Sequence, residues 1–340
     1  MSEYNLTGFH STLGYLKAQA SPQVQAQAAA GVIERLIPDK ARLFHVTVDP
    51  KLGPVGKHTF KVLKEDGQIT VNIVGTSGVA AVWGFHHYLK YYCFCHVSWD
   101  SDQLAVPEDL PPVNITVVSA DRFHYYQNVC TTSYSFVWWD WPRWRREIDW
   151  MALNGINLAL AFTGQEAIWQ RVYSKLNLTQ EDISEHFSGP AFLAWLRMGN
   201  IRAFGGPLPD SWHTQSLALQ HRILQHMRNL GIIPVLPAFA GHVPRAFKRL
   251  YPDTPMTLMV DWNNFSDEYC CPYLLEPTSP LFRTVGSMFI SELIAEFGTD
   301  HIYSCDTFNE MTPHNSSATY LSQVSSNIFL AITDVDPSAV

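Results

Sequence analysis

The sequence predicts an α/β fold in which a small N-terminal α+β domain is followed by the first half of a (β/α)8 barrel. Two observations predict it. Helical and strand-like segments are mixed over the first 120 residues, and after them a helix that closes on a glycine is repeatedly followed by an apolar strand. We therefore expect residues 1–120 to form the small domain and residues 121–340 to form an incomplete barrel.

The N-terminal domain is expected to contain two helices and three strands. The helices lie around Val24–Leu36 and over Ser77–Tyr91, where the apolar residues cluster toward one side. The expected strands are short and lie at Arg42–Val48, Thr59–Leu63 and Gln68–Val74. Prolines between Val106 and Val113 favour an extended connector there, so we place the domain boundary near Ala120.

The repeating pattern begins in full with the helix that follows Asp140. Pro142 suits its first turn, Gly155 suits a left-handed cap, and the strand Ile156–Phe162 follows at once. One apolar face of this helix carries Trp141, Trp144, Ile148 and Met151. At helical spacing, the tryptophans interpreted as packing residues without a ligand role are Trp141, Trp144, Trp150 and Trp169.

Two further copies of the pattern follow. The helices Ser211–Leu230 and Phe282–Phe297 close on Gly231 and Gly298, and the strands after them are Ile232–Leu236 and His301–Phe308. With Phe123–Cys130 as an earlier strand, the chain has about four β/α units, whereas a closed barrel of the TIM type needs eight and about 250 residues. In such folds the chemistry lies beyond the C-terminal ends of the strands, so residues there are candidates for a site.

Charge and motif content exclude several classes of protein. Acidic residues outnumber basic ones, 31 to 23, and the longest basic run is Arg145-Arg146, so no nucleic-acid partner is expected. No apolar stretch reaches the roughly 18 residues needed to cross a bilayer, so no membrane partner is expected. The glycine-rich motifs of nucleotide-binding proteins and the Gly-x-Ser-x-Gly motif of serine hydrolases do not occur.

Targeting signals point in two directions. The start at Met1 lacks the basic and apolar regions of a secretory signal peptide, whereas Asn-x-Ser/Thr sequons accept glycans only in the secretory route. The candidate glycosylation sites are Asn5, Asn114, Asn177, Asn264 and Asn315. The 6 cysteines are too few for a disulfide scaffold, although one or two bridges stay open. The adjacent Cys270 and Cys271 are expected to be poor partners for one another.

The segment Asp306–Glu310 lies at the end of the last predicted strand and finishes in an Asn-Glu pair. Such a pair suits a general acid beside an amide that hydrogen-bonds a sugar substituent. The alternative is a structural carboxylate that caps or salt-bridges the next helix. Aromatic residues are abundant, and those beside the strand ends are Tyr134, Trp138, Trp139, Trp195 and Trp262. Flat rings suit sugar faces, which favours the catalytic interpretation of Glu310.

Two other clusters have simpler explanations. Glu166 follows a predicted strand and offers another carboxylate, but Thr163 and Glu166 also match a capping box at the start of a helix, which we favour. Cys93, Cys95 and His96 are zinc-ligand types, yet the cysteine spacing is not that of a zinc knuckle and no second pair follows. We therefore expect neither a metal nor a cofactor.

Longer stretches resemble one family. From Tyr125 the sequence reads Tyr-Tyr-Gln-Asn-Val-Cys-Thr-Thr-Ser-Tyr-Ser-Phe-Val-Trp-Trp-Asp-Trp, which closely resembles the lysosomal-type α-N-acetylglucosaminidases of glycoside hydrolase family 89. The resemblance covers about Phe85 to the end of the chain, so only the N-terminal part of the family's length is matched. It is carried further by residues 147–161, 164–171, 189–195, 234–244 and 306–311.

The resemblance implies a small α/β domain, a (β/α)8 barrel and a C-terminal helical domain. It implies removal of terminal N-acetylglucosamine from heparan sulfate, with retention through two glutamates and without a cofactor. By the Asn-Glu match, Glu310 is the acid/base and Asn309 its neighbour at the sugar. Positions that line the family's sugar pocket fall on Asn128, Cys130, Tyr134, Trp195, Met198 and Trp262. A lysosomal or secretory location is implied, and a homo-oligomer is allowed for the intact family member.

The resemblance also sets the alternatives. The family's nucleophile lies on a later strand, beyond Val340, while retaining chemistry needs two carboxyl groups about 5 Å apart. The chain is therefore expected to be truncated before the nucleophile, and the rival hypothesis is an inactive fragment or isoform that at most binds sugar. Another barrel glycosidase with a different sugar preference is the third hypothesis. The loop Asp267–Cys271 departs from the family's cysteine pattern, and the net charge of -8 is more compatible with one terminal sugar than with a long sulfated chain.

Overall fold

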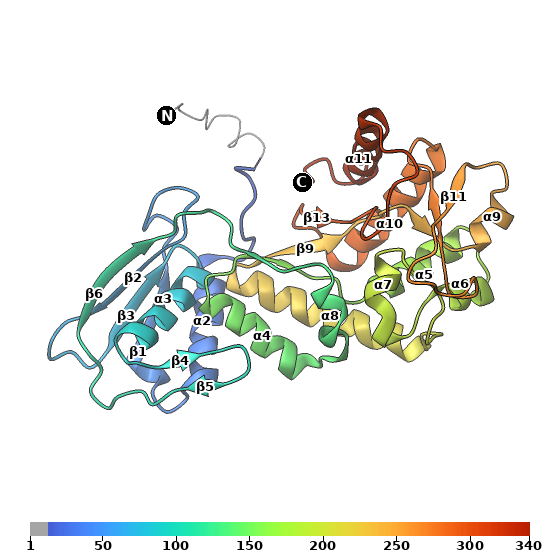
Figure 1. Ribbon diagram of the computed structural model, residues 1–340. Coiled ribbons are helices and arrows are strands. Elements are labelled where there is room, and N and C mark those ends of the chain that lie inside the picture. The colour runs from blue at the N-terminus through green and yellow to red at the C-terminus, as the bar shows by residue number, and fades with distance from the viewer. Residues whose placement is uncertain (1–12) are drawn as a thin grey trace. The chain divides into compact units, whose positions relative to one another are not determined.

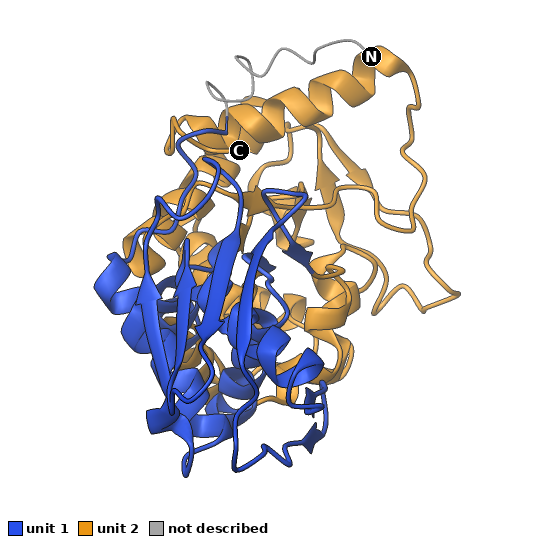
Figure 2. Ribbon diagram, turned by 90° about the vertical axis from the view of Figure 1, so that its left-hand side faces the viewer, with its two compact units in different colours: residues 1–126, 140–159, 222–234 blue, residues 127–139, 160–221, 235–340 orange. Residues whose placement is uncertain are grey.

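The computed structural model describes residues 13–340, which form two compact units (Figure 2). Of the described residues, the first unit comprises 13–126, 140–159 and 222–234. The second comprises 127–139, 160–221 and 235–340. No single cut in the chain separates these units, and the predicted boundary near Ala120 stays a prediction.

The first unit contains a four-stranded sheet (Figure 1). Its strands are β1 (Phe44–Val48), β2 (Thr59–Lys64), β3 (Val71–Gly75) and β6 (Val113–Val118), in the order β1-β3-β2-β6. β3 runs parallel to β1, and β2 is antiparallel to both of its neighbours. Exposed residues alternate with more buried ones along β6, so one face of the sheet is covered and the other is open to solvent.

Helices α2 (Pro22–Leu36) and α3 (Gly78–Tyr91), which lie near the predicted residues, pack against this sheet. The hydroxyls of Ser21 and Ser77 accept backbone N–H groups of the first turns and so cap the two helices. α3 approaches β2 so closely that a Cβ on Gly84 would lie 2.9 Å from the ring of Phe60, which explains the glycine. The short elements of this unit are the 3-10 turn η1 (Ala41–Leu43) and the antiparallel pair β4 (His96–Val97) and β5 (Asp102–Gln103).

Four short strands form a second sheet. They are β7 (Tyr125–Tyr126), β8 (Leu158–Leu160), β9 (Ile233–Pro237) and β13 (Tyr303–Ser304), in the order β7-β8-β9-β13. β7 and β8 pair in parallel, β9 and β13 pair in parallel, and the Ala161 N–H donates to the Val235 carbonyl at 2.9 Å between β8 and β9. Strands that are adjacent in space in their sequence order, with helices between them, are the arrangement of half a (β/α)8 barrel. The predicted fold class is confirmed.

Helices alternate with these strands. They are α4 (Trp141–Leu153), α5 (Gln165–Lys175), α8 (Asp210–Leu230), α10 (Pro280–Phe297) and α11 (Ala318–Thr333). Of these, α4, α8 and α10 begin and end near the predicted residues, whereas α11 was not predicted. The Asp140 carboxylate caps α4, and the Ser279 hydroxyl caps α10. After α4, α8 and α10, Gly155, Gly231 and Gly298 adopt φ values of 75°, 85° and 73°, a region where a Cβ would be strained.

Three of the four predicted barrel strands are wrong in their lengths, whereas β9 agrees with its prediction in length. β7 and β13 have 2 residues each and β8 has 3, much less than the apolar runs that predicted them. Ile156, Ala161 and Phe162 are nevertheless buried outside β8. An apolar run predicts that a segment is buried, whereas a strand also requires backbone hydrogen bonds to a neighbouring strand. Here the buried segment is longer than the part that forms these hydrogen bonds.

Additional elements follow the C-terminal ends of the barrel strands. After β7 come the 3-10 turns η2 (Thr131–Ser133) and η3 (Ser135–Trp138), and between α5 and α8 lie α6 (Gln180–His186), η4 (Pro190–Phe192) and α7 (Leu193–Arg197). Between β9 and α10 lie β10 (His242–Val243), α9 (Ala246–Leu250), β11 (Met256–Leu258) and β12 (Tyr273–Leu275). The three strands form an antiparallel sheet in the order β10-β12-β11. These insertions carry most of the candidate site.

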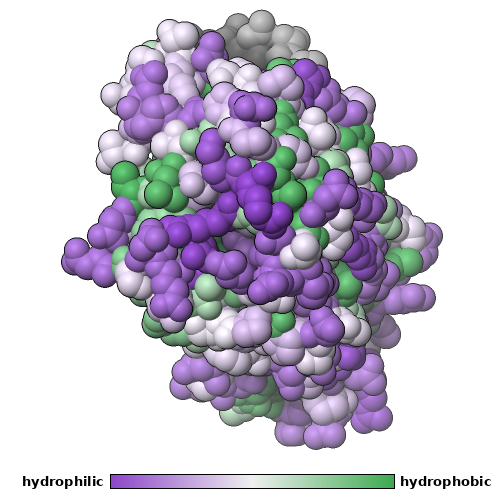
Figure 3. All heavy atoms as spheres, turned by 90° about the vertical axis from the view of Figure 1, so that its right-hand side faces the viewer, coloured by the Kyte–Doolittle hydropathy of each residue, from purple (hydrophilic) through white to green (hydrophobic). Residues whose placement is uncertain are grey.

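The helices within residues 13–340 include none with the length and apolarity needed to span a bilayer. The face shown in Figure 3 is mainly hydrophilic, and its apolar side chains form small groups separated by polar ones.

Candidate active site

Glu310 lies in the segment that follows β13. Its φ of 54° places a non-glycine residue in the left-handed region, and its side chain is exposed. The indole Nε1 of Trp262 donates a hydrogen bond to its Oε2 at 3.1 Å. The next helix, α11, is capped by Ser317, and Glu310 forms no ion pair with any residue in 13–340. The alternative of a capping or salt-bridging carboxylate is therefore wrong for this position.

Asn309 is half-buried and is held on both sides. Its side-chain Nδ2 lies 2.8 Å from the Sδ of Met198, and its carbonyl accepts a hydrogen bond from Asn200 Nδ2 at 3.4 Å. Met198 is buried and Asn200 is completely buried. The peptide that joins Asn309 to Glu310 is therefore anchored to the segment that follows α7.

Cys130, Asn128 and Tyr134 form a second group near the same carboxylate. Asn128 Oδ1 accepts the Cys130 N–H at 2.8 Å, and Cys130 Sγ lies 3.4 Å from Met198 Sδ. Burial raises the pKa of the Cys130 thiol, and the negative charges of Glu310 and Asp306 raise it further. Burial also raises the pKa of the Tyr134 hydroxyl, with Cys130 and Glu310 acting in the same direction. The charge of Glu310 is thus felt by both side chains.

Aromatic rings form a continuous wall beside this group. The ring centres of Tyr134 and Trp195 are 5.7 Å apart, and those of Trp195 and Trp262 are 6.1 Å apart. Phe265, which sequence reasoning did not single out, extends the wall at 5.8 Å from Trp262. The structure thus brings together all of the predicted sugar-pocket residues. Trp138 has a ring contact with Trp212, and Trp139 has one with Phe136.

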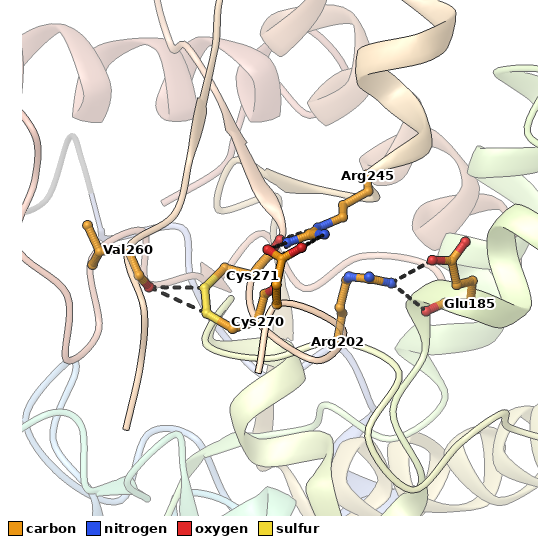
Figure 4. Close-up of polar contacts among 7 residues, drawn as sticks. Glu185, Arg202, Arg245, Val260, Cys270 and Cys271 are labelled. Carbon is orange, nitrogen blue, oxygen red and sulfur yellow. Dashed lines mark hydrogen bonds and ion pairs between the residues drawn. A yellow bond between two sulfur atoms is a disulfide. The ribbon is translucent and has the colours of Figure 1, made fainter. Parts of the chain in front are cut away.

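The loop that carries Trp262 is held by hydrogen bonds at its C-terminal end, near Cys270 and Cys271 (Figure 4). Arg245 donates to the carbonyls of Cys270 at 2.6 Å and Cys271 at 3.1 Å, and to both carboxylate oxygens of Asp267. In the same view, Arg202 pairs with Glu185 at 2.8 Å. A loop held in this way presents Trp262 to Glu310 from a defined direction.

Cys270 and Cys271 form a disulfide with each other, so the expectation that they are poor partners is wrong. The carbonyl of Val260 lies against both sulfur atoms (Figure 4). Both cysteines are buried in an apolar cluster that includes Met259 and Met311, the residue after Glu310. The remaining described cysteines, Cys93, Cys95, Cys130 and Cys305, are free.

Glu166 does not form the capping box that the sequence suggested. The N-cap of α5 is Gly164, with φ of 78°, and no side chain caps it. The carboxylate of Glu166 instead pairs with Arg197, a residue that sequence reasoning missed. The pair lines a cavity of about 60 Å³ together with Trp169, Tyr173, His186 and His242. A bidentate ion pair satisfies Glu166, which makes it unavailable as an acid or base.

Four predicted glycosylation sites are exposed. Asn114 lies on β6, Asn177 between α5 and α6, Asn264 beside Trp262, and Asn315 just before α11. Asn5 lies outside the described residues. Exposure is required of a glycan acceptor, so these sites stay predictions.

The part of the chain in residues 13–340 contains no group of three or more His, Cys, Asp or Glu side chains placed to hold a metal ion. The Cys93, Cys95 and His96 segment therefore has no metal-binding cluster among the described residues.

Parallel strands in barrel order, with an exposed carboxylate and an aromatic wall beyond their C-terminal ends, define the class of barrel glycoside hydrolases. Family models describe the matching regions as the alpha-N-acetylglucosaminidase (NAGLU) N-terminal domain, over residues 27–112, and its tim-barrel domain, over residues 124–340. The chain belongs to the alpha-N-acetylglucosaminidase family.

Individual relatives agree with this assignment. Alpha-N-acetylglucosaminidase of Homo sapiens is 53% identical over 320 residues, which are 93% of this chain and 43% of the human protein. A family 89 glycoside hydrolase from Clostridium perfringens in complex with PUGNAc has a TM-score of 0.86 at 28% identity, covering 100% of this chain and 38% of its own. A doubly substituted form in complex with its substrate GlcNAc-alpha-1,4-galactose gives 0.85 at 28% identity, covering 94% and 36%. The chain spans less than half the length of these relatives.

Proposed function

We propose that Glu310 is the acid/base of a retaining exo-glycoside hydrolase that removes terminal α-linked N-acetylglucosamine from heparan sulfate-type glycans. The observation that carries the proposal is the exposed carboxylate of Glu310, which accepts a hydrogen bond from Trp262 at 3.1 Å and lies beside the aromatic wall. A group that touches the reacting atoms must be reachable by substrate and held in place, and Glu310 meets both conditions.

The geometry suits proton transfer by one oxygen. Trp262 occupies Oε2, and among the described residues no other donor bonds to this carboxylate, so Oε1 stays accessible to a glycosidic oxygen. Glu310 protonates the departing oxygen and later removes a proton from the water that attacks the glycosyl-enzyme. The attacking carboxylate, about 5 Å away in retaining enzymes, belongs to a later strand by resemblance to the family.

The surrounding residues suit a single terminal sugar. The rings of Tyr134, Trp195 and Trp262 offer apolar faces, and the amides of Asn128 and Asn309 offer hydrogen bonds to its substituents. The sulfur atoms of Cys130 and Met198 lie 3.4 Å apart in the same group of residues. The ligands of the Clostridium relatives, PUGNAc and GlcNAc-alpha-1,4-galactose, support an N-acetylglucosamine-type sugar here.

The test is Glu310→Gln in the longest product of the gene that contains this sequence. With an alkyl α-N-acetylglucosaminide, whose leaving group needs protonation, turnover should fall about 10²- to 10⁴-fold. With a dinitrophenyl glycoside the first step needs no acid, so the loss in that step should be far smaller. The control is Glu181→Gln on α6, which is exposed and should change neither rate. Near wild-type turnover of the alkyl glycoside by Glu310→Gln contradicts the proposal.

A second candidate function is a non-catalytic chain that at most binds sugar. It is favoured by the span of 43% of the human relative and by the family's need for a second carboxylate. Assaying the 340-residue chain beside the longest gene product separates the two, because turnover by the 340-residue chain itself excludes this candidate.

We further propose a lysosomal or secretory location. The exposed sequons at Asn114, Asn177, Asn264 and Asn315 support it, since they are open to a glycosyltransferase. The measurement is the mass of the protein purified from its own cells before and after peptide-N-glycosidase treatment; an unchanged mass counts against this location.

A further inference from the structure

Arg197 lies at the end of α7, between two predicted pocket residues, Trp195 and Met198. Its Nε and Nη2 donate to the two carboxylate oxygens of Glu166 at 2.7 and 2.9 Å. The side chains are only 12% and 3% exposed, which makes this a buried bidentate pair. A planar guanidinium matched to a carboxylate in this way has a single well-defined orientation.

The third nitrogen of Arg197 binds the opposite segment of the pocket. Nη1 donates to the hydroxyl of Ser133 at 2.9 Å, and Ser133 is 2% exposed. Ser133 belongs to the turn η2, which is flanked by Cys130 and Tyr134. Backbone hydrogen bonds from Ser133 to Cys130 at 2.9 Å and from Tyr134 to Thr131 at 3.1 Å make the turn compact. A change in the position of Ser133 should therefore also move Cys130 and Tyr134.

Two segments that carry pocket residues thus meet at three points. Cys130 contacts Met198, the ring of Tyr134 lies beside that of Trp195, and Ser133 binds Arg197. The first two are contacts of soft or aromatic groups, which tolerate changes in distance and angle. The third is a charge-assisted hydrogen bond, whose strength depends on distance and direction.

We propose that Arg197, oriented by Glu166, is a positioning residue that sets the spacing between the Cys130–Tyr134 turn and the Trp195–Met198 segment, and thereby the affinity of the pocket for its sugar. This inference rests on the proposed function of the same site. Arg197 acts through Ser133 and its neighbours, whereas proton transfer belongs to Glu310. Its loss should therefore weaken sugar binding more than it slows the chemical step.

The least disruptive variant is Ser133→Ala, which removes only the link and leaves the pair of Arg197 with Glu166 intact. We expect it to raise KM and the Kd for N-acetylglucosamine about five- to tenfold, the loss of one buried hydrogen bond, while kcat changes less than about twofold. Arg197→Lys keeps the charge but loses the planar fork, so it should raise both constants further, by about 10- to 100-fold.

The matched control is Arg249→Lys. Arg249 also pairs through one group with both oxygens of a carboxylate, Asp182, but its side chain is 60% exposed. Exposed pairs contribute little, so KM and Kd should stay within about twofold of wild type. Wild-type values of KM and Kd in both Ser133→Ala and Arg197→Lys would overturn the proposal, as would a fall in kcat without a change in KM.

A measurement without ligand separates this inference from the proposed function. The 340-residue chain is labelled with 5-fluorotryptophan, and the ¹⁹F signals of Trp195 and of Trp83 in the first unit are assigned with Trp→Phe variants. Ser133→Ala should shift or split the Trp195 signal and leave that of Trp83 unchanged. An unchanged Trp195 signal overturns the positioning role. If wild type binds no N-acetylglucosamine, the proposed function fails while the Trp195 signal still decides this inference.

Discussion

Two carboxylates, one in each unit, have opposite surroundings. Asp149 on α4 is 7% exposed in its side chain and accepts hydrogen bonds from Arg35 at 2.7 and 2.8 Å and from His226 at 2.8 Å. Arg35 belongs to α2 and His226 to the part of α8 that lies in the first unit, so Asp149 joins three helices. Glu310 in the second unit is exposed and accepts a hydrogen bond from Trp262 alone among the described residues.

The comparison separates structural from chemical carboxylates. Removing a charge from water is costly, and Asp149 offsets this cost because its oxygens are occupied by donors. A carboxylate satisfied in this way has no oxygen left for a ligand. Glu310 keeps an accessible oxygen, which the proposed acid/base role requires.

The largest expected effect that tests the comparison is on folding. Asp149→Ala removes the acceptor shared by Arg35, whose side chain is 30% exposed, and by His226, so the free energy of unfolding should fall by about 1–3 kcal/mol. Urea denaturation followed by circular dichroism measures it. Asp253→Ala, at an exposed position of the second unit, is the control and should stay within about 0.5 kcal/mol of wild type. A loss below about 1 kcal/mol in Asp149→Ala would show that the hydrogen bonds of Asp149 with Arg35 and His226 contribute little to the stability of the fold.

A second, smaller effect is expected with pH. Burial by itself raises the pKa of Asp149, but hydrogen bonds from His226 and Arg35, with the charge of Arg35, outweigh burial and hold it below its usual value. The unfolded chain then binds this proton at a higher pH than the folded one, so the contribution is present above about pH 4 and is lost as pH falls through the folded value. Unfolding free energies measured between pH 6 and pH 3 should fall less steeply in Asp149→Asn than in wild type. Equal slopes count against the pairing.

The smallest expected effect concerns the one donor to Glu310. Trp262→Phe keeps an aromatic ring in the wall but removes the N–H, so kcat with an alkyl glycoside should fall about three- to tenfold. With a dinitrophenyl glycoside the loss should be smaller, because the departing group needs little protonation. Trp138→Phe serves as the control, since the ring of Trp138 lies against that of Trp212, at 6.3 Å between ring centres. Equal losses with both substrates would show that Trp262 acts on sugar binding and not on Glu310.

Much of the fold follows from signals within a few residues. Asp140 before Pro142 and Gly155 after the helix specify both ends of α4, because capping depends only on neighbouring backbone groups. The sheet β10-β12-β11 was missed, since its strands of 2 or 3 residues carry no measurable periodicity and pair with distant segments. The same limit explains the overestimated lengths of β7, β8 and β13.

In the candidate site too, residues with a local signal were predicted and residues that depend on a distant partner were not. Asn309 and Glu310 were identified because they follow a predicted strand, and the aromatic residues because their number is high. Arg197 was not, because its partner Glu166 is 31 residues away and Thr163 offered a local explanation. Gly164 adopts the positive φ at the start of α5, so the local explanation did not hold.

The sequence by itself determined the order of the four barrel strands and of the helices α4, α8 and α10, the ends of these helices, the half-barrel class and the chemical types gathered after the strands. Only the tertiary structure decided which charges are buried in pairs, that Cys270 bonds to Cys271, and that Trp262 reaches Glu310. Helix caps and helical periodicity depend on residues about one turn apart, so they can be recognised in the sequence. Contacts between distant segments depend on how the whole unit packs, where many weak terms compete and no local pattern records the outcome.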